Sequence, residues 1–525
     1  MMDLLLDINI VIDYCAPRVR WHGQAKESLE QCAAIGGRIW LYAGSVQTLL
    51  YNLYNELKQS RPNLSNRQCM QLAKHRLTYF ARDKHWLAAL AGEGNVFDSE
   101  DPEDEQLLRA LGRFASGTIA LLTRDTLLLN LNDPRILTPE QYCQLPTGNR
   151  KIDFIDLKTQ QDTLRPQLEK NIHRVLHHGQ YIMGPEIKEL EAKLTEYVGV
   201  KHAITAASGT DSLEIALRAL CIGPGDEVIT VPFTWISTAE VIVQVGARPV
   251  FIDIDPVTYN MNVDLLEASI TPKTKAILPV SLFGQMPDYD RINAIAAKFN
   301  LPVIEDAAQS FGATQRGRRS CGVTLIGSTS FFPAKPFGCY GDGGALFTND
   351  DQLAERMRAI RTHGGLQRHH HPYIGMNGRF DTLQATILLA KLPSFDWEVQ
   401  RRQEIGARYT SIINKAFSPE LSTHSSVLTP HIEVSNTSVY AQYTIRVQNR
   451  DALAALLKQQ GIPAAIYYPK CLHEQSAFDF CGYKWGDFPE AEKASREVLS
   501  LPMHPFLNEA DQDRVVAAFR SVLTG

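Results

Sequence analysis

One lysine stands apart in the segment "STSFFPAKPFGCYGDGGALF", residues 328–347. Lys335 lies among aromatic and small residues, and the next charged residue along the chain is Asp342. An amine in such surroundings is poorly solvated, which lowers its pKa and raises its neutral, nucleophilic fraction. A lysine beside a loop could instead extend to water. Because burying a charge is costly, we interpret Lys335 as a candidate nucleophile.

Two further segments carry polar residues where a predicted strand ends. In "AASGTDSLEIAL", Gly209 and Thr210 open a predicted helix, whose free N–H groups and dipole favour an anion. A simple helix cap is the alternative for this Ser-Gly-Thr sequence. In "LPVIEDAAQSFGA", a predicted buried strand ends on Asp306, with Gln309 shortly after. Asp306 could likewise be only a cap, or it could hold a cationic ring nitrogen.

Taken together, these groups match the needs of pyridoxal 5′-phosphate (PLP). The phosphate needs an anion cradle, the ring nitrogen needs a carboxylate, and the aldehyde needs a lysine for a Schiff base. An aromatic face for the ring is offered by Trp235, which follows the next predicted strand in "VPFTWISTAEV". The combination is far more specific than any one of its parts.

The elements that must position these groups alternate between strands and helices from residue 152 onward. Continuous apolar strands such as 201–208, 226–233 and 301–308 are separated by amphipathic helices, which indicates a parallel sheet covered on both faces. The stretch "LPTGNRKID" marks a boundary before this part. We therefore expect an α/β chain with three domains: residues 1–147, a large domain 152–394, and a small α+β domain 395–525.

Residues 152–525 resemble the DegT/StrS family of nucleotide-sugar aminotransferases, which have the aspartate aminotransferase (type I) fold. The resemblance extends through "GQYIMGPEIKELEAKL", "SGTDSL", "GPGDEVITVPFTW", "EDAAQSFGA", "SFFPAKPFGCYGDGGA" and "GMNGRFDTLQATILLAKL". Within the family, the sequence looks closest to the UDP-2-acetamido-2-deoxy-3-oxo-glucuronate aminotransferases of bacterial polysaccharide pathways.

The resemblance implies a role for each matching position around the cofactor. Lys335 would form the Schiff base and move the proton, and Asp306 would pair with the pyridine nitrogen. Gln309 would bond the phenolic oxygen, and Trp235 would stack on the ring. The phosphate would be held by Gly209, Thr210 and Ser330.

Other positions are implied to contact the substrate or a second subunit. In this family the "GMNGRFD" motif crosses a dimer interface, so Asn377 would reach the partner's phosphate site in a homodimer with shared active sites. Arg379 would contact the sugar acid, although a surface salt bridge is the alternative without the motif. Relatives that act on the 3-oxo-uronate show His-Tyr-Pro where this chain has Tyr467 and Tyr468 before a proline. A phenol donates a hydrogen bond but is not cationic near neutral pH.

The implied reaction moves an amino group from an amino acid, with glutamate expected, to a UDP-linked 3-keto sugar for surface polysaccharide synthesis. Lys335 argues against the dehydratases of this fold, which carry histidine there. Two alternatives remain open: a regulatory protein that binds PLP and a sugar nucleotide, or a ribonuclease with an inert aminotransferase-like dimerisation domain.

Composition places the chain among ordinary globular proteins. The net charge of −5 gives no sign of a strongly basic nucleic-acid surface, and no apolar run approaches a membrane span. Nine cysteines without a C-x-x-C pair fit a reducing cytoplasm better than a disulfide framework. We expect a cytoplasmic protein that does not associate with a membrane.

Residues 1–145 resemble a PIN domain, a Mg²⁺-dependent nuclease fold. The resemblance lies in "DIN" after an apolar strand, "DPED" at a helix start, and "TRD" after a second strand. It implies Asp7, Asp104 and Asp125 as metal ligands, with Asp101 as a possible fourth, since carboxylates hold hard cations that activate water. No clean match exists for a further acid of this fold, so a non-catalytic role is an alternative. RNA is a candidate partner, although the balanced charge of this segment does not support it.

Overall fold

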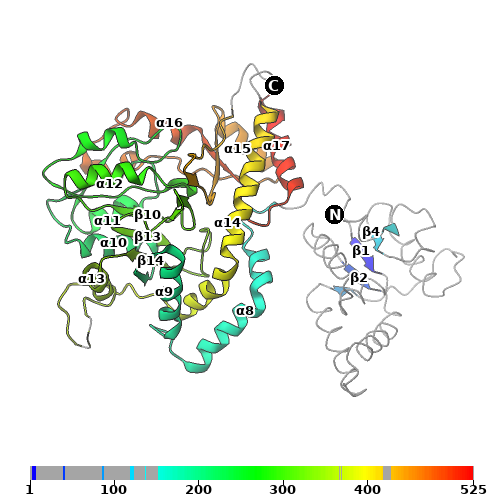
Figure 1. The fold of residues 1–525 in the computed structure, drawn as a ribbon. Helices are drawn as coiled ribbons and strands as arrows, with labels where there is room; N and C mark the ends of the chain where they lie inside the picture. Colours follow the sequence, from blue (N-terminus) through cyan, green and yellow to red (C-terminus); the bar gives the residue numbers. More distant parts are fainter. Residues whose placement is uncertain are drawn as a thin grey trace, which may run out of the picture. The chain divides into compact units, whose positions relative to one another are not determined.

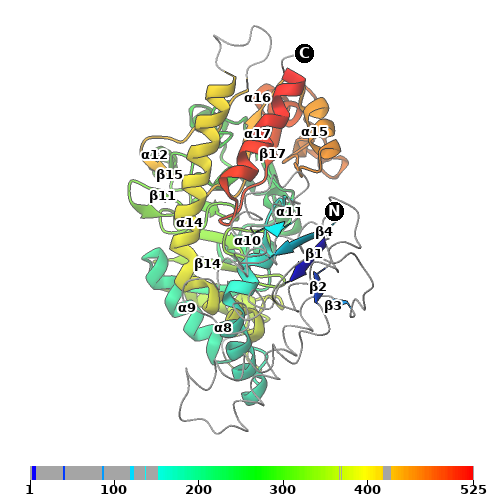
Figure 2. The same cartoon turned by 90° about the vertical axis from the view of Figure 1, so that its right-hand side faces the viewer.

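The computed structural model divides the chain into two compact units, Met1–Lys151 and Ile152–Gly525. In the second unit the structure describes residues 152–523 apart from 366, 368 and 418–426; in the first it describes the backbone of five short strands. Each unit is considered by itself, and Figures 1 and 2 show their elements.

The strands of the first unit form one parallel sheet. They are β1 (Asp3–Leu6), β2 (Ile39–Leu41), β3 (Trp86–Leu87), β4 (Ile119–Leu122) and β5 (Ile136–Leu137). Their order is β3-β2-β1-β4-β5, and every neighbouring pair is parallel. The residues expected to hold a metal lie outside the described residues: Asp7, Asp101, Asp104 and Asp125.

The second unit is built around a seven-stranded sheet. Its strands are β6 (His202–Ala206), β7 (Glu227–Thr230), β8 (Arg248–Phe251), β9 (Thr274–Ile277), β10 (Ile304–Asp306), β13 (Ile326–Ser330) and β14 (Gly344–Thr348). Two ladders, β8-β7-β9 and β10-β13-β14-β6, are joined by parallel bridges from Ile277 to Val303 and from Val280 to Asp306. The expectation of an α/β fold is confirmed for this unit.

One strand departs from the expected parallel arrangement. β14 runs antiparallel to both of its neighbours, β13 and β6. The reason lies in its connection, because residues 331–343 return from β13 through turns without a helix. A parallel partner needs a crossover connection, usually a helix, whereas a direct return gives an antiparallel pair. This return segment contains Lys335.

Helices cover both faces of the sheet, which explains why its strands read as continuous apolar runs. Neighbouring strand residues alternate between two cores: Ala203 belongs to one and Ile204 to the other. α10 (Gly209–Ala219), α11 (Ser237–Gln244) and α13 (Asp351–Arg361) pack in the core of Ile204. α9 (Pro185–Val198) and α12 (Tyr289–Lys298) pack in the core of Ala203.

A 35-residue helix, α14 (Thr382–Ala416), connects the large and small parts of the unit. Its first half packs against α9 and α8 (Leu157–His178), as Figures 1 and 2 show. Its second half joins a separate core with α15 (Arg450–Gln459), α17 (Glu509–Leu523), and the antiparallel pair β16 (Tyr443–Arg446) and β17 (Val498–Leu501). The expected boundary at residue 394 therefore falls inside α14.

The remaining elements are short. They comprise β11 (Thr314–Gln315), β12 (Arg318–Arg319), β15 (Asn436–Thr437), α16 (Pro489–Glu497), and the 3₁₀ turns Val263–Leu265, Glu267–Ser269, Leu282–Gly284, Leu472–Glu474 and Ser476–Cys481. None of the helices among the described residues is long and apolar enough to cross a membrane.

Candidate active site

The polar residues selected from the sequence follow strands that end at one edge of the sheet. Asp306 ends β10, Ser330 ends β13, and Gly209 opens the helix that follows β6. Trp235 lies shortly after β7, which is parallel to these strands. Because parallel strands end at a common edge, the fold collects side chains from four distant segments there.

The start of α10 forms an anion cradle that depends on a glycine. A Cβ atom at Gly209 would lie 2.6 Å from the Cβ of Ser330, so only glycine allows this close approach. Ser208 caps the helix by accepting a hydrogen bond from the Asp211 N–H at 2.9 Å. The N–H groups of the first helical turn have no intrahelical acceptor, so those of Gly209 and Thr210 are suited to a phosphate.

A second helix start adds hydroxyl groups to this cradle. Thr210 Oγ1 and Ser237 Oγ lie 2.8 Å apart, and Ser237 is the first residue of α11. Two positive helix ends and several hydroxyls therefore meet beside Ser330, which favours a doubly charged anion.

Asp306 is buried, with 5% of its surface exposed, and both of its oxygens accept hydrogen bonds. Thr238 Oγ1 donates to Oδ2 at 2.8 Å, and the Ala308 N–H donates to Oδ1 at 3.1 Å. Burial raises the pKa of Asp306, whereas these two bonds and the charge of Lys335 act in the opposite direction. A cationic ring nitrogen beside this carboxylate would favour its ionised form.

Lys335 lies on the return segment after β13, and its N–H donates to the Phe332 carbonyl at 2.9 Å. Its side chain is half-buried. Desolvation lowers the pKa of Lys335, and the negative charge of Asp306 partly opposes this shift. Each of the two groups thus changes the ionisation of the other across the same site.

Behind Asp306, the neighbouring Glu305 is fully buried and holds the strand end in place. Its carboxylate accepts hydrogen bonds from Ser281 Oγ at 3.0 Å, Ser320 Oγ at 2.7 Å and the Cys321 N–H at 2.7 Å. Burial raises the pKa of Glu305 to about 7. We assign it a structural part in fixing Asp306.

Gln309 is buried, and the protein already holds its side chain by hydrogen bonds. Its Oε1 accepts from the Phe283 N–H at 2.8 Å, and its Nε2 donates to Tyr468 Oη at 3.1 Å. A side-chain amide has two N–H donors, so one remains for a cofactor oxygen. Tyr468 thus contacts a residue that is expected to bind the cofactor.

Aromatic rings form one wall of the site. Trp235 is 56% exposed, and its ring centroid lies 6.2 Å from that of Tyr468. Tyr467 lies 5.7 Å from Tyr468 and 6.3 Å from Phe154 by the same measure. Burial raises the pKa of Tyr467 and of Tyr468, so both phenols remain protonated donors.

The "GMNGRFD" loop is attached close to the end of β6. The Ala207 N–H donates to the Gly378 carbonyl at 2.9 Å, and the Gly378 N–H donates to the Arg361 carbonyl at 3.0 Å. Asn377 is exposed. Arg379 is half-buried, and its Nε is buried with no hydrogen-bond partner among the described residues. A guanidinium with an unused donor suits a carboxylate ligand.

Sequence reasoning did not identify three of these hydrogen bonds. They join Thr238 to Asp306, Ser237 to Thr210, and the Phe283 N–H to Gln309. A signal for Thr238 and Ser237 was present, because both open a helix that follows a strand at the same edge. Phe283 gave no such signal, since its N–H reaches Gln309 only through a turn in which Phe283 has a φ of 57°.

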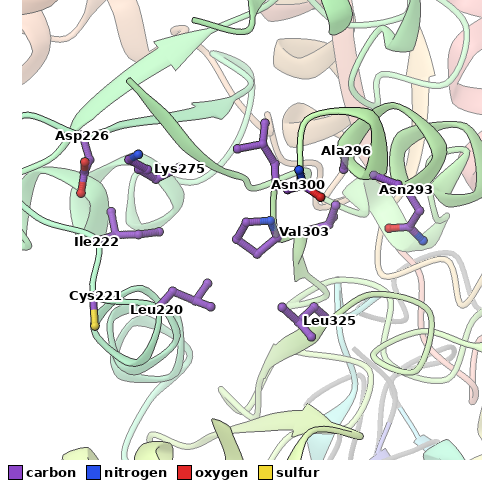
Figure 3. Close-up of a pocket in the computed structure, with 13 residues that line it drawn as sticks. Leu220, Cys221, Ile222, Asp226, Lys275, Asn293, Ala296, Asn300, Val303 and Leu325 are labelled. Atoms are coloured by element: carbon purple, nitrogen blue, oxygen red, sulfur yellow. The ribbon is translucent and has the colours of Figure 1, made fainter. Parts of the chain in front are cut away.

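A large hollow of about 880 Å³ lies at a different place in the unit (Figure 3). It is lined by Asp226 before β7, Lys275 on β9, Val303 before β10 and Leu325 before β13. These residues mark the amino ends of the strands, whereas ligands of parallel sheets bind at the carboxyl ends. We therefore take the edge of the sheet beside Lys335, and not this hollow, as the candidate active site.

No group of three potential metal ligands occurs within the part of the chain that the structure describes. Instead, the site combines an anion cradle, a buried carboxylate and a desolvated amine. Donors remain for ligand groups: the N–H groups at the start of α10, which Gly209 allows to lie close to Ser330, and Arg379 Nε, which has no partner among the described residues. These residues fit PLP, and the surrounding sheet and helices form the α/β fold of PLP-dependent aminotransferases.

Comparison with known proteins agrees with this fold. The model of the DegT/DnrJ/EryC1/StrS aminotransferase family matches residues 162–520. The chain is 52% identical over 367 residues to the UDP-2-acetamido-2-deoxy-3-oxo-D-glucuronate aminotransferase of Pseudomonas aeruginosa, covering 70% of this chain and 99% of the relative. It is 45% identical over 365 residues to a "pleiotropic regulatory protein" of Geobacillus stearothermophilus, covering 70% and 96%.

A solved structure of NtdA from Bacillus subtilis, with bound cofactor PMP, aligns with a TM-score of 0.65 and 27% identity. The alignment covers 81% of this chain and 98% of that one. The chain belongs to the DegT/DnrJ/EryC1/StrS aminotransferase family, which confirms the resemblance seen in residues 152–525.

The contact at Gly209 gives a direct test of the anion cradle. We expect Gly209→Ala to weaken PLP binding by about tenfold or more, because overpacking costs roughly 1–3 kcal/mol and 1.4 kcal/mol corresponds to a factor of ten. Fluorescence titration of the apoprotein with PLP measures this change. Gly223→Ala is the matched control, because a Cβ there would meet its nearest atom at 3.7 Å. Equal affinity of the Gly209 variant and the wild type would contradict the cradle.

Proposed function

We propose that this protein transfers an amino group from an amino acid, with glutamate as donor, to a UDP-linked 3-keto sugar in the synthesis of a bacterial surface polysaccharide. The observation that supports this most strongly is the pairing of Lys335 with the buried Asp306, whose charges interact at the carboxyl edge of the sheet. The 52% identical relative from Pseudomonas aeruginosa favours a 2-acetamido-3-oxo-uronate as acceptor.

PLP, when bound, supplies an electrophilic carbonyl carbon and a ring that withdraws electrons from the donor's Cα. The chain's own residues supply proton transfer and orientation. Lys335 is desolvated, so its amine can accept a proton at Nζ and return it during each half of the reaction. Asp306 is positioned by Thr238 to balance a positive ring nitrogen, and Trp235 offers a face for stacking.

Arg379 supports an acidic acceptor. Its Nε is buried without a partner among the described residues, and leaving such a donor unused is costly. A uronate carboxylate would satisfy it through paired hydrogen bonds. Tyr467 stands where histidine is expected for this acceptor, and Tyr468 follows it. As neutral donors, both phenols can bond sugar hydroxyl or carbonyl oxygens.

Replacing Lys335 tests the proposed function. We expect Lys335→Ala to abolish amino transfer, because the variant lacks the amine that would move the proton, while the fold persists. The measurement is product formation from a panel of UDP-linked 3-keto sugars with glutamate, followed by mass spectrometry; circular dichroism checks folding.

Transfer at the wild-type rate by Lys335→Ala would contradict the assignment. A wild type that binds PLP but transfers no amine from any donor would instead support a regulatory protein, the role in the name of the Geobacillus relative.

We further propose a homodimer with shared active sites. Asn377 and the 86% exposed Ile374 lie in the same loop as Arg379. Tyr181 and Ile182 are also exposed, and they pair with the end of this loop through the Thr382 N–H and Asp381. Exposed apolar side chains beside a ligand site favour contact with another protein surface. A second copy would bring its Asn377 to the phosphate cradle.

Mixing two inactive variants tests whether the site is shared. Heterodimers of Lys335→Ala and Asn377→Ala contain one site that has both native residues, so we expect partial recovery of activity after the subunits are mixed and exchanged. Each variant mixed with itself is the control. Failure to recover, although native mass spectrometry shows the heterodimer, would place the action of Asn377 within its own subunit or outside the reaction.

The PIN-like interpretation of residues 1–147 stays a proposal for a second, metal-dependent activity. Its support is the parallel order β3-β2-β1-β4-β5, in which β1 and β4 are neighbours and Leu6 pairs with Leu122. Asp7 directly follows β1 in the sequence, and Asp125 comes shortly after β4. Ligands of parallel sheets bind beyond such adjacent carboxyl ends.

Cleavage of RNA by the full chain tests this proposal. We expect Mg²⁺-dependent cleavage that is lost in Asp7→Asn, because the amide removes one negative charge from the metal site. Gel analysis of a labelled single-stranded RNA, with and without chelator, measures it. An absence of metal-dependent cleavage in the wild type, or equal cleavage by Asp7→Asn, would leave this unit without a nuclease role.

A further inference from the structure

A second lysine, Lys391 on α14, is buried near the segment that contains Lys335. Only 2% of its surface is exposed. Its Nζ donates to the Gly338 carbonyl at 2.6 Å and lies 4.3 Å from the centroid of the Tyr340 ring. Gly338 and Tyr340 belong to the return segment between β13 and β14. A charged lysine is rarely buried unless it is paired, so its contacts need an explanation.

The carbonyl that Lys391 binds belongs to a very compact turn. A Cβ at Gly338 would lie 2.5 Å from the carbonyl oxygens of both Phe332 and Pro333. The Lys335 N–H donates to the same Phe332 carbonyl, and the Cys339 N–H donates to that of Phe331 at 2.8 Å. A shift of Gly338 would therefore move the backbone of Lys335.

α14 holds this turn at a second point. Gln384 Oε1 accepts from the Tyr340 N–H at 2.8 Å, and its Nε2 donates to the Tyr340 carbonyl at 3.2 Å. Gln384 and Lys391 are seven residues apart in the sequence, which places them on one face of the helix. The side chains of one helix thus hold the turn on the C-terminal side of Lys335.

The charge of Lys391 is partly balanced inside the protein. Burial lowers the pKa of Lys391 to about 8, while Glu398 and Cys339 act in the opposite direction. Glu398 is itself buried and accepts two hydrogen bonds from Gln160 Nε2, at 2.8 Å each. Replacing such buried charged groups by apolar residues is often neutral or stabilising, so packing alone does not explain them.

We propose that Lys391 is a positioning residue for Lys335: its bond to Gly338 and its contact with Tyr340 hold the turn that directs the Lys335 amine toward the site. This inference rests on the proposed role of Lys335. It assigns Lys391 no contact with substrate or cofactor.

The test compares Lys391→Met, which keeps a chain of similar size but removes the donor and the charge, with the wild type. Hydrogen exchange of the apoprotein, read by mass spectrometry, should be faster in residues 331–343 and unchanged in β6 and α10. With cofactor bound, kcat for the glutamate half-reaction should fall by about 10- to 100-fold, since small misplacements of a reacting group have this effect. The KM for glutamate should change little.

Lys415→Met is the matched control, because Lys415 is exposed on the same helix; it should behave as the wild type in both measurements. Lys391→Gln also removes the charge of Lys391, and it replaces Lys391→Met in both measurements if that variant fails to fold. Unchanged exchange in residues 331–343, or unchanged kcat, in the folded variant would overturn the proposal. A wild type without any transfer would refute the proposed function, whereas the exchange comparison would still test the contact of Lys391 with the turn.

Discussion

The electrostatic interaction between Lys335 and the buried Asp306 is the constraint on which the candidate site of the second unit depends. Burial raises the pKa of Asp306 and lowers the pKa of Lys335, and each group opposes that shift in the other. Thr238 and the Ala308 N–H fix the carboxylate, while a tight turn fixes the amine. The pair is therefore ready to bind a ligand that carries its own positive ring nitrogen and an electrophilic carbon.

The scaffold meets this constraint with rigid elements on each side. The parallel strands β10 and β13 place their last residues, Asp306 and Ser330, at one edge of the sheet. Because Gly209 has no side chain, α10 can approach Ser330 closely. The antiparallel return into β14 lets the Lys335 segment pass along that edge instead of continuing into a covering helix. α14, which contributes to the cores of the large and small parts, supports the return segment through Lys391 and Gln384.

Most of this fold could be predicted from sequence, because its strands are continuous apolar runs and its helices are amphipathic. The family resemblance supplied the site residues. The direction of β14 and the start of α14 at Thr382 could not be predicted, since both depend on tertiary packing rather than local pattern. Contacts such as Phe283 with Gln309, 26 residues apart, or Lys391 with Gly338, 53 residues apart, leave no local signal. In the first unit, the short acidic motifs lie outside the described residues.

The visible spectrum of the purified chain with PLP, before and after addition of glutamate, examines the central pair most directly. A cofactor joined to Lys335 and balanced by Asp306 should absorb in the visible range, and glutamate should bleach that band by converting the cofactor to its amine form. A spectrum without a visible band, or a band that no amino acid changes, would contradict the account of a transferase built on these two residues.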